Sequence, residues 1–232
     1  MTFQITTYYR LLLLAVIFGN LWIWRILREN LLIGILLIIL SFLLFKQVIT
    51  KVQKRQFFLL ILIFATISFI TLRVGFDNNI FVSSAEEKIQ QNTRHGFYSV
   101  ELGKLFKNTI SLQFHKYLST SIYKLERNLF YNLDPNLYFF AAHPRERAGV
   151  GEFGKYPWFL LPFFIIGLFL AIRYYYLPTG IYFIWTSLIS IFLNPGYYLG
   201  PVLFFPLMNI LIVLGLIFSL RIVKNKIGGV RL

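Results

Sequence analysis

Residues 202–220 read VLFFPLMNILIVLGLIFSL, a run of nineteen positions without one charged side chain. A helix needs about 20 mainly apolar residues, within a range of about 17–25, to cross the hydrocarbon core of a bilayer. Five further apolar blocks occupy residues 11–26, 31–45, 57–72, 158–172 and 181–193. Flanking Trp, Tyr, Lys and Arg residues extend short blocks by anchoring at the membrane surface. The sequence therefore predicts an all-α, polytopic membrane bundle of about six transmembrane helices.

The overall composition agrees with a membrane protein. Apolar residues make up 57% of the chain and charged residues 14%, whereas an average soluble domain carries about 25% charged residues. Cysteine is absent, which excludes disulfides and thiolate metal sites. The net charge of +14 is largely a signal of membrane topology, because basic residues flank the apolar blocks. We therefore expect membrane lipid as a partner and no nucleic acid.

Two short segments carry basic residues and no acid, one between the second and third apolar blocks and one after the sixth. They contain Lys46, Lys51, Lys54 and Arg55 in the first and Arg221, Lys224, Lys226 and Arg231 in the second. Cytoplasmic loops of membrane proteins are enriched in Lys and Arg, so both segments are assigned to the cytoplasm. With six spans the N-terminus is cytoplasmic as well. The predicted location is the cell (inner or plasma) membrane, with residues 73–156 extracytoplasmic.

This assignment divides the chain into three parts. Residues 1–72 form transmembrane helices one to three, 73–156 form a helical extracytoplasmic insertion between spans three and four, and 157–232 form helices four to six with a basic tail. The insertion holds eight of the nine acidic residues. Ser84 and Glu87 match a capping box that starts a helix, and His95-Gly96 predicts its end.

The rest of the insertion shows helical periodicity. From Phe97 to Tyr131 apolar residues recur at helical spacing, and lysines including Lys124 occupy the other face. Such a helix lies on a membrane surface or covers the bundle with a solvated basic face. The sequence Asp134-Pro135-Asn136 predicts a turn.

The candidate binding residues follow this turn. His143, Arg145 and Arg147 lie a few residues before the apolar block that begins at Trp158, where lipid phosphates are expected. Guanidinium groups bind phosphate oxygens bidentately, so these three residues are candidates for a lipid-phosphate site. Glu146 and Glu152 could orient an arginine or accept a proton. The alternative is an interfacial loop whose arginines contact ordinary lipid phosphates or pair with Glu146, and the spacing does not separate the two.

Other classes of site find less support. The chain has three histidines, none in a metal-binding spacing, so no metal site is predicted, and no cofactor is predicted either. Arg94 and His95 are interpreted as solvated residues. Charges near the apolar blocks lie at their ends, which disfavours an ion-coupled transporter. Pro195, Pro201 and Pro206 predict kinks or re-entrant turns in the fifth and sixth spans.

Residues 136–168 carry a resemblance to a known family. The polar stretch with Pro144-Arg145 and several glycines, followed by a helix that opens Leu161-Pro162-Phe163-Phe164 and reaches Gly167-Leu168, resembles part of the polyprenyl-phosphate-sugar-dependent membrane glycosyltransferases. That group has the GT-C fold and includes protein O-mannosyltransferases and aminoarabinose transferases. The similar region is the last outer loop and the helix after it. The resemblance implies a polyprenyl-phosphate sugar as a partner, with arginines on its phosphate.

The chain departs from this family in its first loop. Family members place a catalytic Asp or Glu in a long first outer loop, whereas here about five residues around Glu29 join the first two apolar blocks. Catalytic candidates are therefore limited to Glu29, Asp134, Glu146 and Glu152. We expect an accessory or degenerate relative acting in envelope glycan or glycolipid assembly, with a membrane protein as a further partner. A minimal active glycosyltransferase and a membrane scaffold unrelated to sugars are the alternatives, so enzymatic activity stays open.

Overall fold

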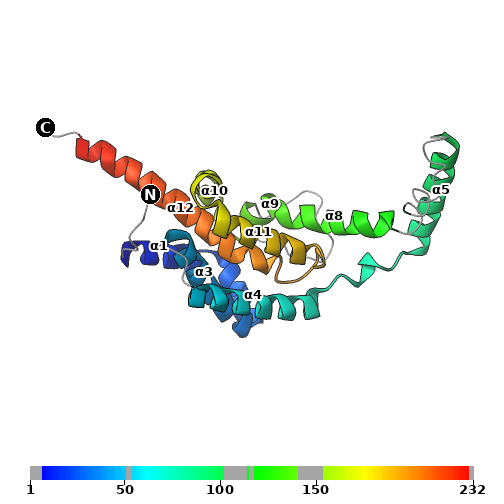
Figure 1. The fold of residues 1–232 in the computed structure, drawn as a ribbon, viewed down its shortest axis with the longest axis horizontal. Coiled ribbons are helices and arrows are strands. Elements are labelled where there is room, and N and C mark those ends of the chain that lie inside the picture. Colours follow the sequence, from blue (N-terminus) through cyan, green and yellow to red (C-terminus); the bar gives the residue numbers. More distant parts are fainter. Residues whose placement is uncertain (1–6, 51–53, 102–113, 115–117, 141–153, 230–232) are drawn as a thin grey trace.

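The structure is a computed structural model that describes residues 7–50, 54–101, 114, 118–140 and 154–229. Within these ranges it is helical, with one isolated β-bridge between Phe76 and Leu193 and no strand (Figure 1). The α-helices are α1 (Thr7–Phe18), α2 (Leu21–Glu29), α3 (Leu31–Ile49), α4 (Lys54–Gly75), α5 (Ala85–Glu101), α8 (Ser119–Leu133), α9 (Asn136–Phe139), α10 (Leu161–Tyr174), α11 (Tyr176–Ser190) and α12 (Phe205–Gly229). Short 3-10 helices cover Asn78–Ile80, Trp158–Leu160 and Val202–Phe204. The all-helical prediction is confirmed for this part of the chain.

Helix α12 is the centre of the bundle, and helices α1, α3 and α10 pack against it. In its membrane-length window, Val202–Val223, 83% of the residues are buried, against 22% in the window of α4. A helix that is hydrophobic all round is expected to be buried inside a protein or a membrane. Among the described positions 202–217, which form its buried half, Asn209 is the one polar side chain. Its amide donates to the Phe205 carbonyl at 2.9 Å.

Two glycines allow α10 and α12 to cross in backbone contact. A Cβ atom on Gly167 would collide with the carbonyl of Leu211, and a Cβ atom on Gly215 would collide with the carbonyl of Phe163. Small residues are enriched where membrane helices cross, because they let the backbones approach and gain van der Waals contact. This crossing fixes α10, and with it the segment that precedes α10, against the central helix.

The first apolar block is broken rather than continuous. Helices α1 and α2 meet at an angle of 67°, and Asn20 satisfies the backbone on both sides of the break. Its amide nitrogen donates to the carbonyls of Val16 and Ile17 at 2.9 and 2.7 Å, and its amide oxygen accepts from the Ile23 N–H at 2.9 Å. Asparagine is a favoured N-cap residue, so Gly19-Asn20 is the sequence signal for this bend.

The fourth and fifth apolar blocks also form a bent pair. Residues 158–174 and 176–190 meet at 113°, and both open ends of this pair lie beside α8 and α9. At one end the Tyr156 N–H donates to the Tyr138 carbonyl at 2.8 Å. At the other end the Asn132 side-chain amide donates to the Ser190 carbonyl at 2.9 Å. The predicted kinks differ in place, since Pro206 stands in the first turn of α12, while Pro195 and Pro201 lie in the connection before it.

The count of membrane-spanning helices follows from these bends. Three described helices, α3, α4 and α12, are long and apolar enough to cross a membrane, and each bent pair adds one more if it counts as one span, giving up to five. The chain is thus compatible with a multi-pass membrane protein. The count of six spans and the extracytoplasmic position of residues 73–156 stay predictions.

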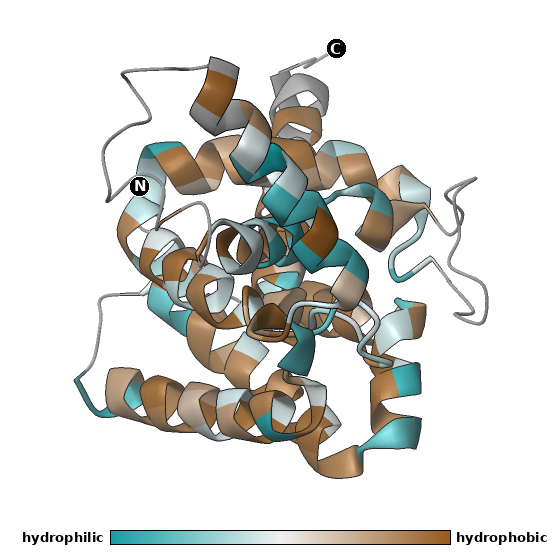
Figure 2. Ribbon diagram, turned by 90° about the vertical axis from the view of Figure 1, so that its right-hand side faces the viewer, coloured by the Kyte–Doolittle hydropathy of each residue, from teal (hydrophilic) through white to brown (hydrophobic). Residues whose placement is uncertain are grey.

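The two ends of the bundle carry different chemistry. At one end the Arg221 guanidinium donates to the Tyr9 hydroxyl at 2.7 Å, so the start of α1 and the basic end of α12 lie together. At the other end α8 packs on the C-terminus of α11, and α5 stands away from the bundle (Figure 1). Figure 2 views the molecule from the α5 end and shows that the long helices of the bundle are predominantly hydrophobic.

The structure tests three local expectations, two in α5 and one in the turn that follows α8. The capping box is confirmed, because the Ser84 N–H donates to Glu87 Oε2 at 3.0 Å and the Glu87 N–H donates to Ser84 Oγ at 3.1 Å. The predicted stop at His95-Gly96 is wrong, since α5 continues to Glu101. The turn at Asp134 is confirmed, with Asp134 Oδ1 accepting from the Asn136 N–H at 2.9 Å.

The glycine crossing can be tested by adding one methyl group. Gly167→Ala should destabilise the protein by roughly 1–3 kcal/mol, as overpacking does, although alanine raises helix propensity by about 1 kcal/mol. Gly180→Ala in α11 is the matched control, because no atom lies within 4 Å of its added Cβ. Thermal unfolding in detergent measures both. Equal stability of Gly167→Ala and the unsubstituted chain would contradict the close crossing.

Candidate functional site

The three residues predicted to bind a lipid phosphate, His143, Arg145 and Arg147, all fall in residues 141–153, outside the described part of the chain. The catalytic candidates Glu146 and Glu152 fall there as well. The chain on either side is described and well packed. It ends at Phe140 on one side and resumes at residue 154 on the other. The described part of the candidate site is therefore its base, meaning the residues that flank positions 141–153 on both sides.

The base is closed by hydrogen bonds between its two segments of chain. The Tyr156 N–H donates to the Tyr138 carbonyl at 2.8 Å, and the Lys155 ammonium donates to the Leu137 carbonyl at 2.7 Å. The Tyr138 hydroxyl in turn donates to the Asn132 carbonyl at 2.6 Å. The residues that enter and leave the candidate loop thus lie side by side.

Lys155 is buried, with 6% of its surface exposed, and aromatic rings surround its charge. Its ammonium lies 5.6 Å from the centre of the Trp22 ring and 6.0 Å from that of Tyr138, within the range of a cation–π interaction. Gly200 completes the site with a φ of +70°, and an added Cβ there would lie 3.1 Å from Lys155 Cε. Only glycine adopts this left-handed backbone readily, so Gly200 both makes the turn and leaves room for the lysine.

The base is anchored to the central helix by an aromatic cluster. The Trp22 indole donates to the Leu199 carbonyl at 2.8 Å, and its ring packs edge-on against Tyr156 and Phe205 at 6.1 and 5.5 Å. The Tyr156 hydroxyl donates to Asn209 Oδ1 at 3.1 Å. Burial raises the pKa of the Tyr156 hydroxyl well above 10, so this donor stays protonated at neutral pH. We call Trp22, Tyr138, Lys155, Tyr156 and Gly200 the loop base.

A second charged cluster lies where α8 meets the turn after α4. Asp77 is 1% exposed and accepts from Asn128 Nδ2 at 3.1 Å, while Arg127 Nη2 lies 3.6 Å from Asp77 Oδ2. The Lys124 ammonium donates to the carbonyls of Asn79 and Val82 at 2.8 and 2.9 Å and to Glu87 Oε2 at 2.8 Å. All three ammonium protons have an acceptor, so Lys124 joins α5 and the 77–82 turn to α8.

This arrangement corrects one expectation. Lys124 was predicted to lie on the solvated basic face of an amphipathic helix, but its side chain is 5% exposed. The ammonium points inward because it donates to the backbone carbonyls of Asn79 and Val82 in the irregular turn. The Glu87 carboxylate compensates the positive charge of the ammonium. No helical period predicts this, because the acceptors belong to another segment.

A polar pocket of about 440 Å³ opens between α5 and α8. Its lining includes Glu87, Arg94, His95, Lys124 and Arg127. The sequence predicted only that Arg94 and His95 are solvated. The structure shows that both line this pocket together with the Glu87 carboxylate. Within the described ranges no group of three His, Asp or Glu side chains could hold a metal ion.

The two described catalytic candidates have other surroundings. Glu29 is exposed at the C-terminal end of α2, and Asp134 binds the backbone of its own turn. The loop base contains neither residue. The sequence analysis also missed Trp22 and Lys155. For Lys155 the available signal was its position directly before the aromatic sequence Tyr156-Pro157-Trp158.

Comparison with known proteins adds no assignment: no family model, curated protein or solved structure matches the chain.

The role of Lys124 can be tested by removing its charge while keeping its length. Lys124→Met removes the ammonium that donates to the carbonyls of Asn79 and Val82 and to Glu87, and hydrogen bonds to charged groups contribute about 1.5–3 kcal/mol. Hydrogen exchange should speed up in residues 77–101 and in α8 but not in α12. Lys88→Met, at an exposed lysine of α5, is the control. Unchanged exchange in Lys124→Met would contradict the anchoring role.

The same contact predicts a dependence on pH. The hydrogen bond from Lys124 is the main cause that lowers the pKa of Glu87 below its ordinary value of 4.5. A carboxyl whose pKa is lowered by folding stabilises the fold above its unfolded pKa and loses that contribution as the pH falls through the folded pKa. After correction for the intrinsic exchange rate at each pH, protection in α5 should therefore fall below about pH 4.5, and Glu87→Gln should show the low protection already at pH 7. Protection that does not change with pH would exclude this contact as the cause.

Proposed function

We propose that this chain is a multi-pass membrane protein that binds the phosphate of a polyprenyl-phosphate-linked sugar and serves as an accessory subunit in envelope glycan or glycolipid assembly. The observation that carries the proposal is the loop base. It holds a buried ammonium among aromatic rings, formed by residues that flank, along the sequence, the segment that contains Arg145 and Arg147. One fixed cation and two guanidinium groups within a short stretch are opposite in charge to a lipid phosphate, and guanidinium groups bind phosphate oxygens bidentately.

The proposal includes the orientation in the membrane. The termini and the basic connector after α3 face the cytoplasm, and residues 73–156 with the loop base face outward. The contact between Tyr9 and Arg221 supports it, because it holds α1 and the end of α12 at one end of the bundle. The positive-inside tendency assigns that end to the cytoplasm.

The accessory role is preferred to catalysis for a physical reason. A general base must lie within hydrogen-bonding reach of the proton that it removes, and the loop base presents an ammonium and tyrosine hydroxyls rather than a carboxylate. A minimal glycosyltransferase that uses Glu146 or Glu152 is the second candidate, favoured by their place in the same short segment as the arginines. Transfer of sugar from a polyprenyl-phosphate donor by the purified protein would establish this second candidate over the first.

Binding is tested with a diazirine-bearing polyprenyl phosphate in proteoliposomes. Irradiation should attach the probe within residues 140–156. Arg145→Ala with Arg147→Ala should lower attachment by roughly tenfold or more, because hydrogen bonds to charged groups contribute about 1.5–3 kcal/mol each. Lys88→Ala with Arg94→Ala removes two exposed cations from α5 and is the matched control. Equal attachment in both double variants, or none in the unsubstituted protein, would reject the proposal.

A further inference from the structure

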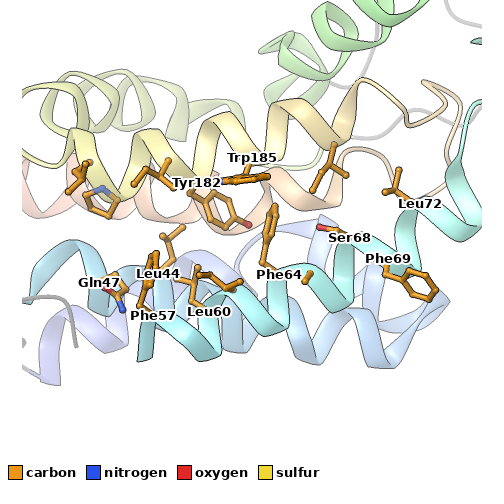
Figure 3. A pocket seen from close by; sticks show the side chains of 16 residues that line it. Leu44, Gln47, Phe57, Leu60, Phe64, Ser68, Phe69, Leu72, Tyr182 and Trp185 are labelled. Atoms are coloured by element: carbon orange, nitrogen blue, oxygen red, sulfur yellow. The ribbon is translucent and has the colours of Figure 1, made fainter. Parts of the chain in front are cut away.

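An apolar groove of about 620 Å³ runs along the bundle between α4 and α11, with α3 as its floor at one end. Aromatic and aliphatic side chains of α4 and α11 face one another across it (Figure 3). Phe64 and Tyr182 meet edge-on at 5.3 Å, and Trp185 lies next to them (Figure 3). Part of the lining, including Phe57, Ile61 and Trp185, is exposed on the surface of the bundle, so a membrane lipid would have direct access to this groove.

The dimensions of the groove fit a single hydrocarbon chain. Its lining on α4 extends from Phe57 to Leu72, which corresponds to about 22 Å of helix at 1.5 Å per residue. Dividing the volume of about 620 Å³ by that length gives a mean cross-section of about 28 Å², a width of about 6 Å. Carbon atoms pack about 3.5–4.0 Å apart, which leaves room for one chain.

One end of the groove carries an unsatisfied polar side chain. Gln47 is 5% exposed, and neither its amide nitrogen nor its amide oxygen has a hydrogen-bond partner in the described residues. It lies at the end of the groove beside Phe57 (Figure 3). Buried polar groups are generally hydrogen-bonded, so this amide indicates a polar group of a ligand. An ester carbonyl is an acceptor of the right kind for its N–H₂ group.

Cations lie just beyond the same end. Lys46 precedes Gln47 in the last turn of α3, and Lys54 and Arg55 open α4 one turn before Phe57. Lys54 and Arg55 are both exposed. One helical turn corresponds to about 5 Å, so the amide and the cations are arranged at two successive depths. A glycerophospholipid has acceptors in the same order, with ester carbonyls below an anionic phosphate.

We propose that this groove binds one acyl chain of an anionic glycerophospholipid from the leaflet at the basic end of the bundle. The chain lies between α4 and α11, an ester carbonyl accepts from Gln47, and the phosphate lies against Lys54 and Arg55. This site is separate from the loop base at the other end of the bundle, and neither proposal depends on the other.

The test counts retained lipids by native mass spectrometry after reconstitution in phosphatidylglycerol or phosphatidylcholine. The unsubstituted protein should retain one phosphatidylglycerol per chain, preferred roughly tenfold over phosphatidylcholine because Lys and Arg near a membrane surface attract anionic lipid. Lys54→Ala with Arg55→Ala should abolish the preference. Gln47→Leu, which keeps the size of the side chain, should lower retention of both lipids several-fold.

A pair of neighbouring substitutions separates groove binding from general lipid adhesion. Ala65→Trp fills the groove, because Ala65 lines it, whereas Thr66→Trp adds the same bulk at the next exposed position, which does not line the groove. Retention should be lost in the first and kept in the second, with both proteins melting alike. Equal retention in the two variants would overturn the proposal. Displacement of phosphatidylglycerol by equimolar polyprenyl phosphate, or a dimer that retains no lipid, would also overturn it.

Discussion

The backbone contact between α10 and α12 is the constraint on which the remaining structure depends. Inside a membrane the lipid tails are as apolar as the side chains, so helices associate through close packing rather than through burial from water. Gly167 and Gly215 supply that packing by removing the side chain on each helix at the crossing. Once α10 is fixed in this way, Lys155 and Tyr156 just before it must meet Trp22 and Asn209, and α11 just after it must return toward α8.

The polar contacts then stabilise the bends of a helix arrangement that is determined by packing. Each one satisfies a backbone group that a bend has released. Asn20 does this between α1 and α2, Trp22 for the Leu199 carbonyl, and Asn132 for the end of α11. In an apolar environment an unpaired carbonyl is costly, so these side chains determine where the helices can turn. The polar contacts of the loop base lie at such turns, because that is where polar atoms are permitted.

The sequence predicted the helical class, the compatibility with a membrane and the extent of most apolar helices, because a long uncharged run has one stable outcome in lipid. It also predicted the Ser84–Glu87 cap, since both partners lie within one turn. It did not predict the break at Gly19-Asn20 or the 113° bend after Tyr174, because apolar blocks on each side of a short break look continuous. The burial of Lys124 and Lys155 escaped prediction for a different reason. The carbonyl groups that accept their hydrogen bonds lie 18 to 45 residues away along the chain, which is beyond any local sequence pattern. The arginines of the predicted site lie outside the described residues.

The position of α12 has a consequence for biosynthesis. A chain is made from its N-terminus, yet the helix with the most buried surface follows all of the helices that pack around it. Until α12 is made, the faces of α1, α3 and α10 that it will cover lack this partner. Addition of α12 covers these faces and brings Arg221 to Tyr9, 212 residues away. Completion of the bundle thus waits for α12, and a nascent chain that stalls before residue 205 lacks the helix at the centre of its core.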